Sequence, residues 1–230
     1  MTTFRAMHAP GQLLLLANAW DAGSARLIEA RGAPAIATTS AGLAWSRGYP
    51  DGDQLPPAVL TAAVAEIARV VSNPVSVHIE GGYSGAARVV AENVRAVIDA
   101  GAVGINLEDG TSAPELLCTK IEAVRGVAAR AGVDLFVNAR CDVYLRGLAA
   151  PEAALAETLE RARKFREHDP RVEIIDPEIE DYQVLKLHNF YVRFRLPLMV
   201  EVQCFEWAPG VGPASLPGGD ASIVAQGRQM

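Results

Sequence analysis

The segment VSVHIEGGYSGAARVVAENVRAVIDAGAVGINLED spans residues 75–109 and holds two short apolar runs around a longer mixed stretch. Val75–Ile79 and Gly104–Leu107 are the apolar runs, and Ala86–Ala100 between them is rich in Ala, Val, Glu and Arg. This alternation predicts two parallel strands joined by a crossover helix. Gly101 follows the helical stretch, where a left-handed cap favours glycine. Residues 75–109 therefore indicate a β–α–β unit.

The same alternation extends in both directions from this unit. The apolar runs are continuous rather than alternating, which indicates strands covered on both faces, as in parallel sheets. Gly32 and Gly132 again follow helical stretches. The pattern predicts an α/β fold, a (β/α)₈ TIM-type barrel. The further strands expected are Leu13–Ala17, Ala35–Thr38 and Leu135–Val137, and the further helices are Ser24–Arg31, Ala58–Val71, Pro114–Ala131 and Pro151–Arg166.

The last third of the chain has a different character. After residue 165 alanine becomes rare and the apolar pattern is irregular, although strands at Val172–Ile175 and Leu198–Val202 and a helix near Ile179–Leu187 are expected. A Pro/Gly-rich tail follows Trp207. This gives seven strands, without an evident eighth. We expect a single barrel domain over residues 1–230, with a divergent part at 166–230 that leaves closure of the barrel open.

Bulk composition excludes several classes of protein. The net charge is −6, with no concentrated basic surface for nucleic acid. Leu13–Leu16 is too short an apolar run for a signal segment or a membrane span. Cys118, Cys141 and Cys204 are scattered without a CxxC pair, which indicates reduced thiols and no zinc site. We expect a cytoplasmic protein without nucleic-acid or membrane partners.

Polar residues gather where the predicted strands end. The active site of a parallel barrel lies at the carboxyl ends of its strands. Taken singly, each of these residues is more often a solvated loop residue, a helix cap or a packing residue. Their convergence after five strands favours a metal-dependent barrel enzyme. The residues are Asn18, Trp20 and Asp21; Ser40, Ala41 and Gly42; His78 and Glu80; Glu108 and Asp109; and Asn138, Arg140 and Asp142.

The residue types suit one chemistry. Glu80 and Glu108 offer the carboxylates that Mg²⁺ prefers. Arg140 can grip a substrate carboxylate at two points. Ser40, together with the backbone N–H groups of the two residues after it, can hold another carboxylate oxygen, because glycine at position 42 allows close approach. A metal and such donors would stabilise an enolate.

Six motifs closely resemble the isocitrate lyase/phosphoenolpyruvate mutase superfamily, and most of all its bacterial phosphonomutase-like branch. The resemblance runs from about residue 12 to about residue 165 and fades beyond it. The motifs are Asn18-Ala19-Trp20-Asp21-Ala22-Gly23-Ser24-Ala25-Arg26, Thr39-Ser40-Ala41-Gly42-Leu43-Ala44, Gly48-Tyr49-Pro50-Asp51-Gly52, Ile79-Glu80-Gly81-Gly82-Tyr83, Gly104-Ile105-Asn106-Leu107-Glu108-Asp109-Gly110 and Asn138-Ala139-Arg140.

The resemblance implies an enzyme dependent on Mg²⁺ or Mn²⁺, a lyase or mutase. It would cleave or form a C–C or P–C bond next to the keto group of a small 2-oxo acid, through an enolate. It also implies a homo-oligomer, a tetramer or dimer in which a C-terminal helix is exchanged between subunits. The residues implied are Asp51 and Arg140 as catalytic groups, Ser40, Ala41, Gly42, Asn138 and Arg140 as substrate-binding groups, and His78, Glu80 and Glu108 as metal-site groups.

Three departures separate this chain from the family pattern. His78 stands where the family usually has an aspartate that touches the metal, and imidazole suits Mn²⁺, Fe²⁺ or Zn²⁺ better than Mg²⁺. Residues 109–114 lack the Lys-Lys-Cys-Gly-His type of motif of true isocitrate and methylisocitrate lyases, so isocitrate cleavage is not expected. Pro197-Leu198-Met199-Val200 only faintly resembles the seventh strand.

Two other functions compete with the lyase or mutase. An imine-forming aldolase needs a lysine inside the barrel, whereas Lys120, Lys164 and Lys186 all fall on helix-like segments. The second is a metal-poor, catalytically impaired barrel that binds a metabolite or scaffolds an oligomer. His78 and the divergent C-terminal part motivate it. Metal titration separates it from the enzyme, because the relic binds no divalent ion.

Overall fold

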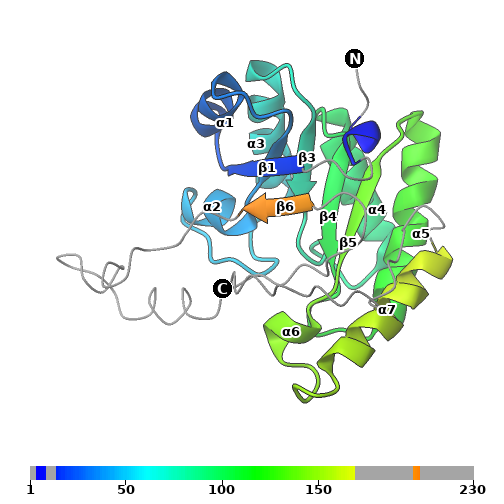
Figure 1. Ribbon diagram of the computed structural model, residues 1–230. Coiled ribbons are helices and arrows are strands. Elements are labelled where there is room, and N and C mark those ends of the chain that lie inside the picture. Colours follow the sequence, from blue (N-terminus) through cyan, green and yellow to red (C-terminus); the bar gives the residue numbers. More distant parts are fainter. Residues whose placement is uncertain (1–3, 9–13, 169–198, 203–230) are drawn as a thin grey trace, which may run out of the picture.

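The computed structural model describes residues 4–8, 14–168 and 199–202 (Figure 1). These residues form one parallel sheet with helices packed on it. The strands are β1 Leu14–Ala19, β2 Ile36–Thr38, β3 Val75–His78, β4 Gly104–Glu108, β5 Phe136–Arg140 and β6 Met199–Val202. The helices are the short 3-10 helix η1 Arg5–Met7 and the α-helices α1 Ala22–Ala30, α2 Ser40–Trp45, α3 Pro57–Val70, α4 Ala87–Asp99, α5 Pro114–Ala131, α6 Val143–Arg146 and α7 Ala154–His168.

The strand order is β5-β4-β3-β2-β1-β6. From β1 to β5 each strand therefore lies beside its neighbour in sequence, and the helices pack in the same succession, α1 on α3, α3 on α4, α4 on α5 and α5 on α7. A barrel has this running order, whereas a doubly wound sheet reverses direction at a switch point. The expected α/β class with a parallel sheet is confirmed. Closure into eight strands lies outside the described residues.

Helix ends follow the expected local rules. Asp21 caps α1 in a capping box, in which its side chain accepts from the Ser24 N–H and the Ser24 hydroxyl accepts from the Asp21 N–H. Gly132 ends α5 with a φ of 68°, in the left-handed region open to glycine. These caps fix where the chain leaves each helix and enters the next strand.

The hydrophobic core divides into a large and a small cluster. The large one lies between the sheet and its helices and includes Ile105 and Leu107 of β4 packed with α4 and α5 residues. The small one holds Phe4, Leu14 and Leu16 near the amino ends of the strands. A Cβ at Gly104 would come within 2.6 Å of the Phe4 ring, so that ring requires a glycine there. Apolar packing thus fills the amino ends and leaves the carboxyl ends for polar groups.

Several boundaries differ from the sequence expectations. The five strands and five helices expected before residue 169 all occur, with ends shifted by up to three residues. The short helices α2 and α6 were not expected. Of the expected strand 198–202, the described residues Met199–Val202 form β6, which pairs with β1 on the side away from β2. Val172–Ile175, Ile179–Leu187 and the Pro/Gly-rich tail lie outside the described residues. No helix among the described residues is long and apolar enough to span a membrane.

Candidate active site at the carboxyl ends of the strands

Glu108 and Arg140 are register partners at the carboxyl ends of β4 and β5. Their side chains form an ion pair. Arg140 also donates to Asp142 at two points, from Nε to Oδ1 at 2.7 Å and from Nη2 to Oδ2 at 3.1 Å. Glu108 and Asp142 are almost fully buried, with side-chain exposures of 9% and 1%. A planar guanidinium matched to carboxylates is strongly oriented, so Arg140 is fixed between two acids.

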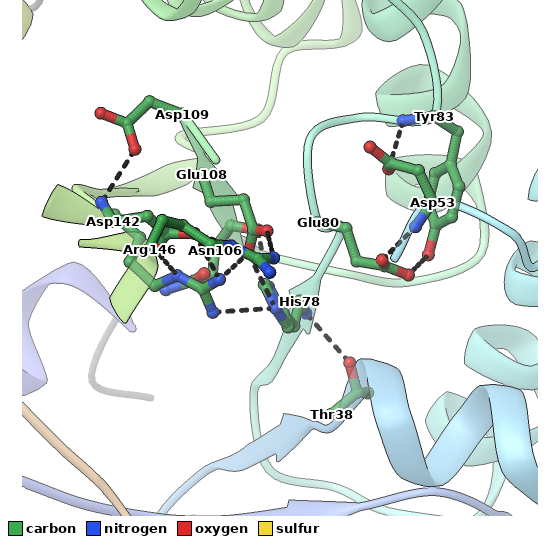
Figure 2. Close-up of polar contacts among 11 residues, drawn as sticks. Thr38, Asp53, His78, Glu80, Tyr83, Asn106, Glu108, Asp109, Asp142 and Arg146 are labelled. Atoms are coloured by element: carbon green, nitrogen blue, oxygen red, sulfur yellow. Dashed lines mark hydrogen bonds and ion pairs between the residues drawn. The ribbon is translucent and has the colours of Figure 1, made fainter. Parts of the chain in front are cut away.

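His78, the last residue of β3, reaches the same cluster (Figure 2). Its Nε2 lies 3.2 Å from Arg140 Nη1 and 3.3 Å from Glu108 Oε2, while its Nδ1 lies 3.3 Å from the Asn106 carbonyl. A carbonyl only accepts hydrogen bonds, so Nδ1 carries a proton when it bonds Asn106. A neutral ring then accepts from Arg140 at Nε2, and a charged ring donates from Nε2 to Glu108. Protonation of His78 therefore selects its partner.

The charge of Glu108 is stabilised by its surroundings. Burial alone would raise its pKa, but the hydrogen bond and charge of His78, together with the charges of Arg140 and Arg146, lower the pKa to about 2. Arg146 contributes from a distance, because its guanidinium lies 3.9 Å from Glu108. Glu108 is thus a carboxylate at neutral pH.

Glu80 belongs to a second cluster, on the other side of Figure 2 from Glu108. Its carboxylate accepts from the backbone N–H of Asp53 and, at 2.9 Å, from the Tyr83 hydroxyl. Asp53 Oδ1 accepts from the Tyr83 N–H at 2.9 Å. All three residues have left-handed backbone, with φ of 51° at Glu80, 57° at Asp53 and 60° at Tyr83. Such strain is held only where the surroundings fix it, and it concentrates at functional sites.

Burial is the main influence on the titratable groups of this second cluster. It raises the pKa of the Glu80 and Asp53 carboxyls and of the Tyr83 hydroxyl. Nearby acids act in the same direction, Asp51 on Glu80 and Glu108 on Asp53. Positive charge has the opposite effect on the pKa, from Lys120 on Asp53 and from His78 on Glu80.

Lys120 of α5 supports this loop from behind. Its Nζ donates to the Gly81 carbonyl at 2.5 Å, and the residue is buried. Burial lowers the Lys120 pKa, while the charges of Asp53 and Glu108 raise it. The expected helical position of Lys120 is confirmed, yet the side chain reaches the loop that carries Glu80. The exposed Lys164 of α7 instead pairs with Glu115, and Lys186 lies outside the described residues.

A buried ion pair joins α7 to the site. Arg161 Nη1 donates to Asp109 Oδ2 at 2.9 Å, and Asp109 Oδ1 accepts from the Asp142 N–H at 2.8 Å. Asp142 in turn holds Arg140. The side chain of Asp109 has no exposed surface. Arg161 thus contacts Arg140 only indirectly, through Asp109 and Asp142.

The remaining predicted residues lie around these clusters. Ser40 and Ala41 are buried in the first turn of α2, whose N-cap Thr39 accepts from the Gly42 N–H at 3.3 Å. A Cβ at Gly42 would come within 2.6 Å of Thr39 Cγ2 and 3.1 Å of Trp20 Cβ, so packing requires glycine there. Asp51 is exposed in the loop after α2.

Asn138 and Asn106 are register partners on β5 and β4. The Nδ2 atoms of both, and Oδ1 of Asn106, are buried and have no hydrogen-bond partner in the described part of the chain. Buried amides normally find a partner, so the two Nδ2 donors suit the oxygen of a water or ligand, and the Asn106 Oδ1 acceptor suits a donor.

The three predicted metal-site residues are not gathered around one point. His78 and Glu108 touch, whereas the Glu80 carboxylate faces Asp53 and Tyr83 (Figure 2). No group of three or more His, Cys, Asp or Glu side chains in the described ranges is placed to hold a metal ion. The backbones of Glu80 and Glu108 nevertheless adjoin, since the Glu108 N–H donates to the Glu80 carbonyl at 2.9 Å. In donor type and backbone position these two carboxylates fit a divalent cation, provided that Glu80 changes partners.

Sequence reasoning missed Asp53, Tyr83, Arg146 and Arg161. Tyr83 and Asp53 lie in loops, where backbone angles set side-chain direction and no periodic pattern exists. Arg146 had a usable signal, because it follows Asp142 by four residues, which is one helical turn. Arg161 had none, since a charged residue on an amphipathic helix usually faces solvent.

Comparison with known proteins agrees with this geometry. Residues 4–168 match the family described as phosphoenolpyruvate phosphomutase. An uncharacterized protein of Mycobacterium tuberculosis is 37% identical over 165 residues, which cover 71% of this chain and 60% of that protein. The chain therefore spans part of this relative's length.

Solved structures give the same assignment. The crystal structure of a presumed phosphonomutase from Burkholderia cenocepacia J2315 is 41% identical, with a TM-score of 0.68 over 72% of this chain and 70% of that one. A 2,3-dimethylmalate lyase structure is 25% identical, with a TM-score of 0.62 over 70% of this chain and 57% of that one. The chain therefore belongs to the phosphoenolpyruvate mutase/isocitrate lyase superfamily of lyases and mutases.

Proposed function

We propose that the chain is a metal-dependent lyase or mutase that cleaves or forms a C–C or P–C bond next to the keto group of a small 2-oxo acid, through an enolate. The observation that carries the proposal is the meeting of His78, Glu108 and Arg140 at the strand ends, within the segment that matches the family. The 2,3-dimethylmalate lyase and the presumed phosphonomutase support the two bond types by their names. Isocitrate cleavage is not part of the proposal, because residues 109–114 lack its motif.

The side chains of the site suit enolate chemistry. An enolate places negative charge on the former keto oxygen, and fixed cations and N–H donors stabilise that charge. Arg140 is such a cation, held in place by Asp142 and Glu108. Burial of His78 and Glu108 keeps water from the developing charge. In this proposal Asp51 acts from the exposed loop, and Ser40 to Gly42 with Asn138 receive the substrate carboxylate.

We propose Mg²⁺ or Mn²⁺ as the cofactor, with Glu80 and Glu108 as its carboxylate ligands. When bound, the cation would polarise the keto oxygen and add to the stabilisation of the enolate. The imidazole of His78 lies beside Glu108. Because imidazole nitrogen is a softer ligand than a carboxylate, its presence favours Mn²⁺ or a later metal over Mg²⁺.

The test is a screen of oxaloacetate, phosphonopyruvate and 2-methylmalate-type acids with Mg²⁺ and with Mn²⁺, following pyruvate release and, for phosphonopyruvate, the formation of phosphoenolpyruvate. Turnover of at least one acid that needs the metal is expected. Calorimetric titration of each metal into wild type and His78→Asp forms the second arm. We expect His78→Asp to bind Mg²⁺ more tightly, because a carboxylate is the harder ligand. No turnover with either metal, and equal metal affinities in both proteins, would count against the proposal.

One observation favours a second candidate, the metal-poor barrel that only binds a metabolite. The carboxylates of Glu108 and Glu80 already have partners within the protein, Glu108 in an ion pair with Arg140 and Glu80 in a hydrogen bond from Tyr83. A protein of this kind would bind a small acid equally well with metal and with a chelator. The calorimetric arm separates the two candidates.

A further inference from the structure

Arg140 has little capacity left for a substrate. Its Nε and Nη2 bond both oxygens of Asp142, Nη2 also pairs with Glu108, and Nη1 lies 3.2 Å from His78 Nε2. A guanidinium has five N–H donors, and these contacts engage four of them. A two-point grip by Arg140 on a substrate carboxylate would require breaking the pair with Asp142.

Arg146 is in the opposite situation. It ends α6, one turn after Asp142, and its guanidinium faces the same two acids (Figure 2). The distances are 3.7 Å to Asp142 Oδ2 and 3.9 Å to Glu108 Oε1, too long for hydrogen bonds. Its side chain makes no hydrogen bond within the described part of the chain and is 45% exposed. Arg146 is thus drawn to the site by charge while its donors stay available.

An ordinary surface arginine has a different geometry. Arg95 of α4 binds Asp99 one turn along its own helix, with Nε 2.9 Å from both carboxylate oxygens, and the partner side chain is 56% exposed. The acids that Arg146 faces are at most 9% exposed and belong to the candidate site. The partly exposed Arg146 side chain therefore lies beside that site.

Charge counting leads to the same conclusion, and it rests on the proposed function. A divalent cation held by Glu80 and Glu108 is neutralised by them, and Asp142 neutralises Arg140. Asp53 belongs to the Glu80 cluster, where Lys120 offsets it, so Arg146 has no counter-charge left beside Glu108 and Asp142. A substrate with a single carboxylate uses the cation and the carboxylate-binding loop, and a second anionic group is needed to engage Arg146.

We infer that Arg146 is a second anion-binding residue of the site, which selects small acids that carry a second carboxylate or a phosphonate over acids with one carboxylate. Arginine suits both groups, because its fork matches two oxygens of either. In this assignment Arg140 mainly provides a fixed positive charge within the site, and Arg146 binds the second anionic group of the substrate.

Malate and lactate test this assignment, because they share a 2-hydroxy acid and differ by one carboxylate. Neither has the keto group, so binding is measured apart from turnover. Calorimetric titrations use the full chain in saturating Mg²⁺ and again in Mn²⁺, with wild type, Arg146→Gln and Arg146→Lys. Arg88→Gln is the matched control, since Arg88 pairs with Glu92 on α4 and its side chain is 79% exposed. Circular dichroism checks that each variant is folded.

We expect Arg146→Gln to weaken malate binding about tenfold, equivalent to about 1.4 kcal/mol, and lactate binding less than about twofold. Arg146→Lys should keep part of the malate affinity, and Arg88→Gln should change neither ligand. Equal weakening of both acids, no weakening of either, or a wild type that binds neither acid would overturn the inference. A different outcome is that Arg146→Gln selectively weakens malate binding while the wild type turns over no 2-oxo acid. This result would overturn the proposed reaction and support Arg146 as an anion-binding residue.

Discussion

At the scale of single residues, Glu108 makes the clearest link between burial and charge. Its pKa of about 2 lies below the ordinary value of 4.5, so protonation in acid favours the unfolded chain. The stability that its charge contributes is complete above pH 4.5 and is lost as the pH falls towards 2. Glu108→Gln should therefore flatten the pH dependence of the free energy of unfolding in this window.

The same substitution should cost stability at neutral pH. Removing one partner of a buried ion pair leaves Arg140 only partly compensated, which typically lowers the free energy of unfolding by about 3–5 kcal/mol. Urea unfolding between pH 2 and pH 7 measures both effects. Glu66→Gln on the exposed side of α3 is the control and should follow wild type. A variant with the pH profile of wild type would show that Glu108 does not hold its charge through Arg140 and His78.

The sequence predicted the positions of these residues better than their partners. His78, Glu108 and Arg140 end or adjoin strands, and the apolar runs before them fix that placement. The direction of Glu80 could not be predicted, because its left-handed φ of 51° turns the side chain towards Asp53 and Tyr83. Such a backbone angle is set by the folded loop rather than by local propensity.

At the scale of elements, the length of a helix decides whether the sequence predicts it. The helix Pro114–Ala131 has 18 residues and a clear apolar period, and its bounds were predicted to the residue. Helices α2 and α6 have six and four residues, too few to show a period. Helix α6 matters most for the site because it carries Arg146. Its end at Gly147, with a φ of 60°, is visible only in the structure.

Helix α7 provides a test of how an element supports the site. Arg161→Met should leave the Asp109 carboxylate buried without its cation, lowering the free energy of unfolding by about 3–5 kcal/mol. Arg163→Met on the same helix is the matched control. Arg163 lies 3.9 Å from Glu160 with a side chain 61% exposed, so we expect a change within about 0.5 kcal/mol. Denaturant unfolding compares the two, and equal effects would mean that the Arg161–Asp109 pair does not anchor α7.

At the scale of the whole molecule, the described sheet has the running order of a barrel from β1 to β5, and β6 lies beside β1 at the edge opposite β5. The alternation of strands and helices predicted this order because each crossover carries the chain to the neighbouring strand. The last third could not be predicted in the same way, because its apolar pattern has no clear period and the family match ends at residue 168. Pairing of β6 with β1 is the contact in the described sheet that joins the last third of the chain to the first strand.

Proline substitutions in β6 test that contact. Residue Leu15 of β1 faces position 200, and Leu16 faces position 201, in a parallel ladder. Backbone N–H groups of successive residues point to opposite sides of a strand, so at one of the two positions the N–H is directed at β1. One of the two substitutions, Val200→Pro or Glu201→Pro, should therefore remove a ladder hydrogen bond and lower the free energy of unfolding by about 1–3 kcal/mol. The second substitution should lower the free energy of unfolding by less.

Val200→Ala and Glu201→Ala are the matched controls, because they shorten the side chain and keep the backbone donor. Urea unfolding of all four variants, with amide hydrogen exchange of β1, gives the comparison. If β6 completes the sheet, the more damaging proline also speeds exchange at Leu14 to Ala17, the β1 residues in register with it. If both prolines match their alanine controls in stability and exchange, β1 does not depend on its pairing with residues 199–202.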